Sequence, residues 1–264
     1  YDPYDGIGIM DSYFPDSQYF SEFERLDRYI DKLRRSDINV DYLVVCSPNY
    51  LHDSHIRYGL RIGANVICEK PIVLNPHNFE TLNKLSKDYS KKIHPILQLR
   101  LHKSIINLRE SILKSQKDNF DVNLNYITSR GNWYNHSWKG DLSKSGGIAT
   151  NIGIHFFDML IWIFGDIKSY NQSYSDDKCC KGELVLERAN VNWFLSINKD
   201  DLPQMAIEEG KTTFREISID GEKLEFSDGF TELHTVSYNK ILNNEGFSLD
   251  DAFKSIKLVS DLRK

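Results

Sequence analysis

DYLVVCSPNYLHDSHIRYGLRIGANVICEKP, residues 41–71, is the stretch that decides the fold class. Two short apolar runs, Tyr42 to Cys46 and Asn65 to Cys68, flank an amphipathic segment from about Leu51 to Ile62. Apolar runs that alternate with helical segments over short loops are typical of a parallel, doubly wound sheet. The sequence therefore predicts strand, helix and strand, with Glu69-Lys70-Pro71 at the end of the second strand.

The pattern changes beyond residue 97. Before it, a helix is predicted from about Pro76 to Tyr89 and a strand from Pro95 to Leu99. After it, strand-like segments follow one another, which predicts an open antiparallel sheet. These segments are Val122–Ser129, Glu183–Leu186, Val191–Ile197 and Phe214–Ile219, the last followed by a turn at Asp220-Gly221. We expect a partial Rossmann-type domain at 1–97 and a substrate-binding and oligomerisation domain at 98–264.

Two helices are predicted to end the chain, from about Leu233 to Leu242 and from about Leu249 to Leu262. Ser248, followed three residues later by Asp251, has the pattern of a helix capping box. We expect the terminal helix to pack back on the first domain.

The beginning of the chain departs from the usual nucleotide-binding pattern. Such a domain opens with a strand, a Gly-rich turn and a helix, with an acidic residue about 20 residues further on. Gly6-Ile7-Gly8 lacks a preceding strand and a following helix, and we interpret it as an ordinary loop. If Tyr1-Asp2 instead ends the second strand, Asp2 is the acidic ribose ligand. The first strand and the Gly-rich turn would then be missing upstream.

Composition narrows the class of function. The 264 residues are 40% hydrophobic and carry a formal net charge of −5, which argues against a nucleic-acid surface of clustered Lys and Arg. The longest apolar stretch, Ile152 to Phe164, contains His155 and Asp158 and is shorter than the roughly 18 residues that a membrane span needs. His52 and His55 lack a third ligand, so no metal is expected. The cysteine pattern and the absence of a visible secretory signal favour the cytoplasm.

Glu69-Lys70-Pro71 is a candidate active-site segment, because open α/β sheets bind ligands at the carboxyl ends of their strands. Lys70 could reach a substrate hydroxyl there, and its pKa would fall if it were desolvated beside a positively charged nicotinamide. A cis bond before Pro71 would turn the lysine into the cleft. The competing interpretation is a solvated lysine at a strand end.

A second candidate lies in the segment SGGIATNIGIHFFD, residues 145–158. Helical spacing gives it one apolar face, made of Ile148, Ile152, Phe156, Met159, Leu160 and Ile163. A separate stripe follows the same spacing and consists of Asn151, His155, Asp158 and Trp162. His155 can accept a proton near neutral pH, and Asp158 can orient it or raise its basicity. The competing interpretation is a buried histidine that only packs the helix.

Three motifs together, SPNYLH at 47–52, EKP at 69–71 and GIHFFD at 153–158, resemble the Gfo/Idh/MocA oxidoreductase family over nearly the whole chain. A narrower resemblance is to bacterial UDP-N-acetyl-glucosaminuronate 3-dehydrogenases, which make a 3-keto nucleotide sugar for lipopolysaccharide O-antigen and other surface polysaccharides. It is carried by 46–71, ILQLR at 96–100, YITSRGNWY at 126–134 and SWKGD at 137–141.

The resemblance implies an NAD-binding Rossmann domain, followed by an open sheet that carries substrate and subunit contacts. The implied cofactor contacts are Asp2, Ser47, Pro48, Asn49, His52, Glu69, Lys70 and Gln98. The implied substrate contacts are Arg130, Trp138, Lys139, Asn151, His155 and Asp158. The broader family usually has aspartate at position 151. Because asparagine cannot take a proton, base catalysis shifts towards His155 or Lys70.

The resulting hypothesis is NAD-dependent oxidation of the C3 hydroxyl of a UDP-sugar. In one version His155 accepts the proton and Lys70 stabilises the alkoxide, and in the other Lys70 accepts it. A different sugar or an inositol as substrate stays open, as does a non-catalytic fragment that binds a sugar nucleotide. The resemblance also implies a homotetramer and NADH reoxidation by exchange or by a second substrate such as 2-oxoglutarate.

Overall fold

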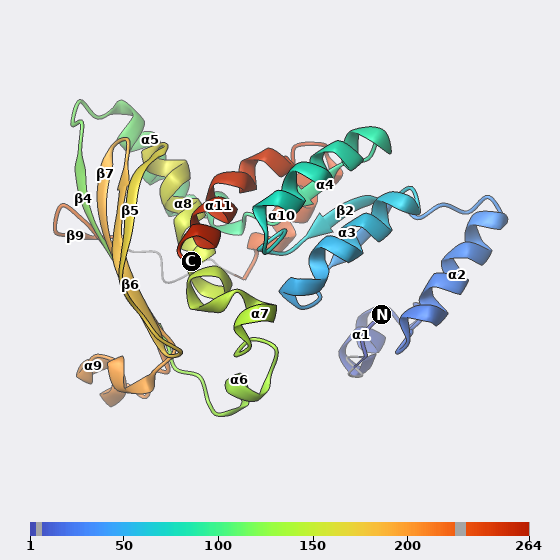
Figure 1. Cartoon of the computed structure of the whole chain (residues 1–264), viewed down its shortest axis with the longest axis horizontal. Coiled ribbons are helices and arrows are strands. Elements are labelled where there is room, and N and C mark those ends of the chain that lie inside the picture. Colours follow the sequence, from blue (N-terminus) through green and yellow to red (C-terminus); the bar gives the residue numbers. More distant parts are fainter. Residues whose placement is uncertain (4–6, 225–230, 264) are drawn as a thin grey trace.

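The computed structural model describes residues 1–3, 7–224 and 231–263 and contains two sheets with helices around and between them (Figure 1). Sheet A is three-stranded and parallel, in the order β1-β2-β3. Its strands and crossover helices are β1 (Tyr42–Val45), α3 (His52–Arg61), β2 (Asn65–Cys68), α4 (Pro76–Asp88) and β3 (Ile93–Pro95). The prediction of a parallel, Rossmann-type sheet is therefore confirmed.

Strand β3 lies earlier than predicted. It ends at Pro95, and Gln98–Leu101 forms a 3₁₀ turn instead of continuing the strand to Leu99. The Ile96 amide donates to the carbonyl of Cys68, the last residue of β2. Beyond this bond β2 offers no further partner, so the chain turns away from the sheet.

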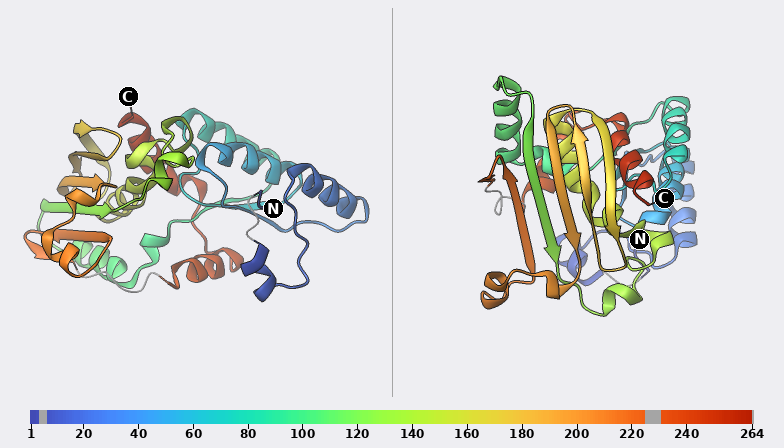
Figure 2. Two further views of the ribbon diagram at one scale, coloured as in Figure 1. Left: turned by 90° about the horizontal axis from the view of Figure 1, so that it is seen from below. Right: turned by 60° about the vertical axis from the view of Figure 1, so that its left-hand side comes forward.

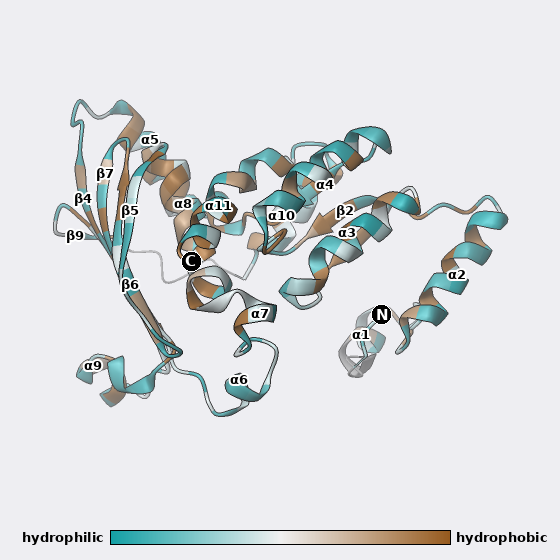
Figure 3. Cartoon of the chain, in the orientation of Figure 1, coloured by the Kyte–Doolittle hydropathy of each residue, from teal (hydrophilic) through white to brown (hydrophobic). Residues whose placement is uncertain are grey.

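The N-terminal segment contains two helices that were not predicted, α1 (Ile7–Tyr13) and α2 (Phe23–Arg35). The loop interpretation is wrong for Ile7 and Gly8, which begin α1, and Gly6 lies outside the described residues. Tyr1-Asp2 belongs to no described strand, and the Asp2 amide donates to the Phe20 carbonyl at 3.1 Å. Helix α2 was not predicted because it buries one residue, Ile30, and is made mostly of hydrophilic residues (Figure 3).

Sheet B has six strands in the order β5-β6-β7-β4-β8-β9. The strands are β4 (Phe120–Thr128), β5 (Ile167–Ser175), β6 (Cys179–Leu186), β7 (Ala189–Ser196), β8 (Thr213–Ile219) and β9 (Glu222–Lys223). The expectation of an antiparallel sheet is wrong at one pair, because β4 and β7 are parallel. The chain leaves the sheet after β4 through a long helical crossover, which is the connection that a parallel pair requires. Edge strand β5 was missed because most of it is exposed and lacks apolar alternation.

Helices cover one face of sheet B and separate it from sheet A (Figures 1 and 2). They include α5 (Lys103–Lys114), α8 (Ile154–Phe164) and α11 (Phe253–Asp261). All six residues of the predicted apolar face are buried, which confirms that face, and α8 is strongly apolar in Figure 3. The helical stretch Leu142–Phe164 is long and apolar enough to cross a membrane by length and composition, but 78% of its apolar window is buried in the core.

The C-terminal elements follow the prediction closely. Helix α10 spans Leu233–Leu242, and a 3₁₀ turn at Leu249–Ala252 leads into α11. The amide and hydroxyl of Ser248 both donate to Asp251 Oδ2 at 2.8 Å, which confirms the capping box. Helix α11 contacts α4 through the rings of Phe253 and Phe79, whose centroids are 4.8 Å apart. The remaining short helices are α6 (Trp133–His136), α7 (Leu142–Ser145) and α9 (Gln204–Glu208).

A substitution at Gly182 in β6 would test how closely β6 packs against its neighbouring strands. A Cβ at this position would lie 2.1 Å from the Asn171 carbonyl oxygen and 2.7 Å from the Trp193 ring. We expect Gly182→Ala to lower the free energy of unfolding by about 1–3 kcal/mol, measured by urea denaturation, because backbone must move. Gly131→Ala is the control, since its added Cβ would meet only the exposed Trp133 side chain, at 3.3 Å. Equal losses in both variants would contradict this interpretation.

Candidate active site

Lys70 lies at the carboxyl end of β2, and its peptide bond to Pro71 is cis. Its side chain is 2% exposed. The amine lies 3.2 Å from Asp158 Oδ2 and 3.4 Å from the Ile154 carbonyl oxygen, both on α8. Lys70 is therefore a buried lysine that faces α8, and the interpretation as a solvated strand-end lysine is wrong.

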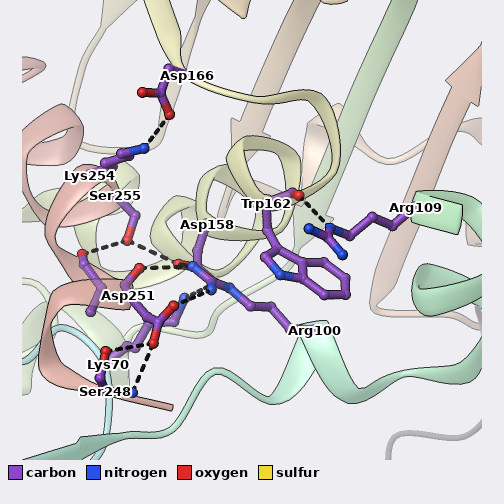
Figure 4. Close-up of polar contacts among 11 residues, drawn as sticks. Lys70, Arg100, Arg109, Asp158, Trp162, Asp166, Ser248, Asp251, Lys254 and Ser255 are labelled. Carbon is purple, nitrogen blue, oxygen red and sulfur yellow. Dashed lines mark hydrogen bonds and ion pairs between the residues drawn. The ribbon is translucent and has the colours of Figure 1, made fainter. Parts of the chain in front are cut away.

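Asp158 is bound on both of its carboxylate oxygens (Figure 4). Arg100 donates from Nε to Oδ2 at 3.0 Å and from Nη2 to Oδ1 at 2.9 Å, and Ser255 Oγ donates to Oδ1 at 3.4 Å. Two-point pairing with a guanidinium is a strong, directional contact. It turns the carboxylate towards Arg100 and Lys70, so Asp158 does not orient His155 by a hydrogen bond, although its charge raises the pKa of His155 as predicted. Its contact with substrate stays a prediction.

Opposing effects set the protonation of Lys70. The pKa of Lys70 is lowered to about 8: burial is the largest cause, Asp158 opposes part of it, and the charge of Arg100 adds to it. Burial alone would raise the pKa of Asp158, but Lys70 and Arg100 hold it below its usual value. Lys70 thus has a pKa close to neutral pH, as a proton-transfer group requires.

His155 lies on the first turn of α8, close enough to Lys70 for the charge of the lysine to affect it. Its packed surroundings, and then the charge of Lys70, lower the pKa of His155 to about 3, so the imidazole is neutral near neutral pH. The side-chain amide nitrogen of Gln98 lies 3.5 Å from His155 Nδ1. An amide nitrogen can only donate, so this arrangement suits the tautomer in which Nδ1 accepts and Nε2 carries the ring proton.

The loop after β1 lies at the same edge of sheet A as Lys70, because the strands are parallel. Asn49 Nδ2 donates to the Ser145 carbonyl at 2.9 Å, and Ser47 Oγ lies 2.9 Å from His55 Nδ1. His52 is buried, with ring nitrogens 2.6 Å from the Pro71 carbonyl oxygen and 2.7 Å from that of Ser47. His52 thereby joins the two loops, while its predicted contact with the dinucleotide, like those of Asp2, Ser47, Pro48 and Asn49, stays a prediction.

Two further groups at this edge fit the nicotinamide end of NAD. Gln98 Oε1 is buried and has no hydrogen-bond partner among the described residues, so it offers an acceptor for an amide N–H. Glu69 follows β2 and lies 3.2 Å from His234 Nε2 of α10, and burial raises its pKa. These two acceptors at the edge of the sheet therefore fit the cofactor that the sequence implied.

The predicted substrate segment forms a cationic and aromatic cluster. Lys139 Nζ lies 5.7 Å from the ring centroids of both Trp133 and Trp138, and the Arg130 guanidinium lies 5.9 Å from that of Trp133. Burial and then Arg130 lower the pKa of Lys139. The structure thus brings Arg130, Trp138 and Lys139 together, as predicted for a common site.

This cluster is tied to the helix that carries His155. Tyr134 OH accepts from Asn151 Nδ2 at 3.2 Å, and Asn151 lies in a π-helical turn, Ala149–Gly153, directly before α8. Insertions of this kind occur often at functional sites. Sequence reasoning missed Trp133 and Tyr134 as site residues, although both belong to a quoted motif.

Arg100 and His234 were also missed. A charged residue inside the apolar run ILQLR requires a buried partner, so the sequence held a signal for Arg100. His234 is 165 residues from Glu69 in sequence, and only the tertiary fold brings the two together.

Two family models match this chain, one over nearly all of the first half and one over part of the second. Residues 4–96 match the oxidoreductase family model with an NAD-binding Rossmann fold, and residues 119–187 match the family's C-terminal alpha/beta domain. The chain belongs to the Gfo/Idh/MocA oxidoreductase family. The family resemblance and the NAD-binding fold predicted from sequence are confirmed.

Solved structures of other members agree over the whole chain. The WlbA (WbpB) dehydrogenase of Thermus thermophilus, in complex with NAD and UDP-GlcNAcA, is 44% identical with a TM-score of 0.95, and the match covers 100% of this chain and 85% of that one. The same enzyme was also solved with NAD and alpha-ketoglutarate. The WlbA dehydrogenase of Bordetella pertussis matches at a TM-score of 0.75 but 16% identity, over 96% of this chain and 81% of that one, which supports the fold alone.

Two curated members are more distant. D-glucoside 3-dehydrogenase of Escherichia coli is 27% identical over 54% of this chain and 43% of its own length. Inositol 2-dehydrogenase of Rhizobium meliloti is 27% identical over 53% of this chain and 41% of its own length. The matched part of this Gfo/Idh/MocA chain therefore spans less than half the length of these relatives.

The buried Asp158 carboxylate should matter for stability. Asp158→Asn leaves Arg100 and Lys70 without their shared counter-ion, and we expect the free energy of unfolding to fall by roughly 3 kcal/mol in urea denaturation. Asp166→Asn is the control, because it removes an exposed ion pair with Lys254 of α11 near the end of the same helix α8, where little change is expected. Comparable losses in the two variants would show that burial of the triad has no special effect.

Proposed function

We propose that this protein is an NAD-dependent dehydrogenase that oxidises the C3 hydroxyl of UDP-N-acetyl-glucosaminuronate. The observation that carries the proposal is the 44% identity, over the full chain, to a dehydrogenase solved with NAD and UDP-GlcNAcA. The buried Lys70 amine beside His155 supplies the chemistry that such an oxidation needs.

Lys70 accepts the hydroxyl proton in this proposal. Its pKa of about 8 leaves a substantial neutral fraction near neutral pH, whereas a His155 pKa of about 3 makes that imidazole a poor base. His155 donates from Nε2 to the substrate oxygen and stabilises the negative charge that develops there. Of the two versions left open by the sequence, the pKa values favour Lys70 as acceptor.

Bound NAD would supply the acceptor for the hydride that leaves C3. Gln98 and Glu69 hold its nicotinamide end in this proposal, through an unpartnered amide oxygen and a carboxylate beside Lys70. Arg130 and Lys139 pair with the carboxylate and diphosphate of the substrate, and Trp138 supplies a flat apolar surface. Asn151 orients a sugar hydroxyl.

The similarity to the Thermus enzyme also suggests how NADH is reoxidised. Because the Thermus enzyme was solved with alpha-ketoglutarate, we propose 2-oxoglutarate as the second substrate that reoxidises NADH. Lipopolysaccharide synthesis and a homotetramer stay predictions from the family resemblance, and a cytoplasmic location stays a prediction from the cysteine pattern.

A substrate panel tests the proposed reaction in the purified protein. We expect NADH absorbance to rise with UDP-N-acetyl-glucosaminuronate and not with myo-inositol or glucose. Lys70→Met and His155→Ala should each lower kcat by about 10²–10⁴-fold, because proton transfer or charge stabilisation is lost. Calorimetry with NAD is the control for folding and cofactor binding. Turnover of inositol without nucleotide sugar, or binding of NAD without turnover of any substrate, would refute the proposed reaction.

The pH dependence distinguishes the two versions of proton transfer. If Lys70 accepts the proton, it must be neutral, and its neutral fraction rises as pH passes its pKa of about 8. We therefore expect kcat/KM to increase with pH, to level off above this value and to show no separate His155 step. A single rise centred on the ordinary pKa of histidine, near 6.5, would instead identify His155 as the base.

A further inference from the structure

A chain of charged side chains runs from the C-terminal helical segment to Lys70 (Figure 4). Asp251 accepts from Arg100 twice, through Oδ1 at 3.3 Å from Nη1 and through its carbonyl oxygen at 2.8 Å from Nη2. Arg100 holds Asp158 by two hydrogen bonds, and Asp158 faces the Lys70 amine at 3.2 Å. The side chains of Arg100, Asp158 and Lys70 are 6%, 2% and 2% exposed, so water does not screen them.

Arg100 has little freedom to move. Its guanidinium carbon lies 5.4 Å from the Phe247 ring centroid and 6.0 Å from that of Trp162. Asp251 is fixed in turn, because its second oxygen, Oδ2, accepts from both the amide and the hydroxyl of Ser248. Asp251, at the beginning of the C-terminal helical segment, therefore holds Arg100, and Arg100 in turn binds the Asp158 carboxylate beside Lys70.

We propose that Arg100 is a positioning residue for Lys70: it fixes the Asp158 carboxylate opposite the amine, and the Ser248–Asp251 capping box fixes Arg100. The inference rests on the proposed function only in giving Lys70 the proton transfer. Without Arg100, Asp158 would have one cation left to pair with and would retain the lysine proton more strongly.

Among the charges around Lys70, Arg100 is the one that lowers the pKa of the amine. The charged or titratable groups on the elements packed against it are Glu69, Asp158, His155, Arg100 and, through Glu69, His234. Both carboxylates favour the protonated lysine, and His155 is neutral near neutral pH. Arg100 is thus the permanent positive charge among these groups that opposes protonation.

The first test measures the Lys70 pKa without relying on activity. ¹³C NMR of protein labelled at lysine Cε gives the titration midpoint of Lys70, with its signal assigned by its loss in Lys70→Met. We expect Arg100→Met to raise this midpoint by about one unit, and Arg100→Lys, which keeps the charge, to return it close to the wild-type value. Should Arg100→Met fail to fold, Arg100→Gln removes the same charge but keeps an amide for Asp158, and the same upward shift is expected.

Arg109→Met is the matched control. Arg109 stacks on Trp162 at 4.5 Å and donates to the Trp162 carbonyl, but it makes no contact with Asp158. This variant should leave the Lys70 midpoint unchanged. A wild-type midpoint in both Arg100→Met and Arg100→Gln, or an equal shift in Arg109→Met, would overturn the inference.

The pH profile of kcat/KM then connects the midpoint to the reaction. In the Arg100 variants the rising limb should move to higher pH by the same amount as the NMR midpoint, a change that a loss of stability alone would not produce. If the midpoint moves but no variant or wild-type protein oxidises the sugar nucleotide, the proposed function fails and the positioning role stands. If the protein is active and the midpoint does not move, the positioning role fails and the proposed function stands.

Discussion

The site depends on one buried group of charges, Lys70, Asp158 and Arg100. Removing three charged side chains from water costs free energy, and only close, well-oriented pairing offsets that cost. Here the carboxylate is shared: one cation meets it with two hydrogen bonds and the other with one. The shared carboxylate fixes the amine of Lys70 without burying it in a simple ion pair, which would hold its proton too firmly for catalysis.

This group also explains how the two halves of the chain form one site. Lys70 comes from the end of β2, Asp158 from α8 and Arg100 from the turn after β3, while Asp251 comes from the beginning of the C-terminal helical segment. Helices α8 and α11 lie between the sheets and bring these segments together (Figure 1). The terminal segment thereby contributes to the arrangement of charges around Lys70 as well as to the packing of the core.

The sequence was informative where a local rule applies. Strand β2 and its crossover helix follow from apolar runs and short loops, the buried face of α8 from helical spacing, and the capping box from Ser248 and Asp251. It failed where the partner is distant. Spacing placed Asp158 one turn from His155, but the carboxylate turns to Arg100, 58 residues away, because a guanidinium satisfies both of its oxygens. The parallel pairing of β4 with β7 likewise depends on a crossover that no local pattern encodes.

The proposed division of labour between Lys70 and His155 follows from the same electrostatics. A cation beside a packed imidazole disfavours a second positive charge, so Lys70 itself keeps His155 neutral. The amide nitrogen of Gln98 faces Nδ1, an arrangement that suits the tautomer with Nε2–H as a donor. An asparagine at position 151 cannot take a proton either. His155 and Asn151 are thus restricted to hydrogen bonding, and Lys70 is the group in this cluster whose protonation changes near neutral pH. Arg100 lowers the pKa of Lys70 and Asp158 raises it, so the two together set the pH of that change.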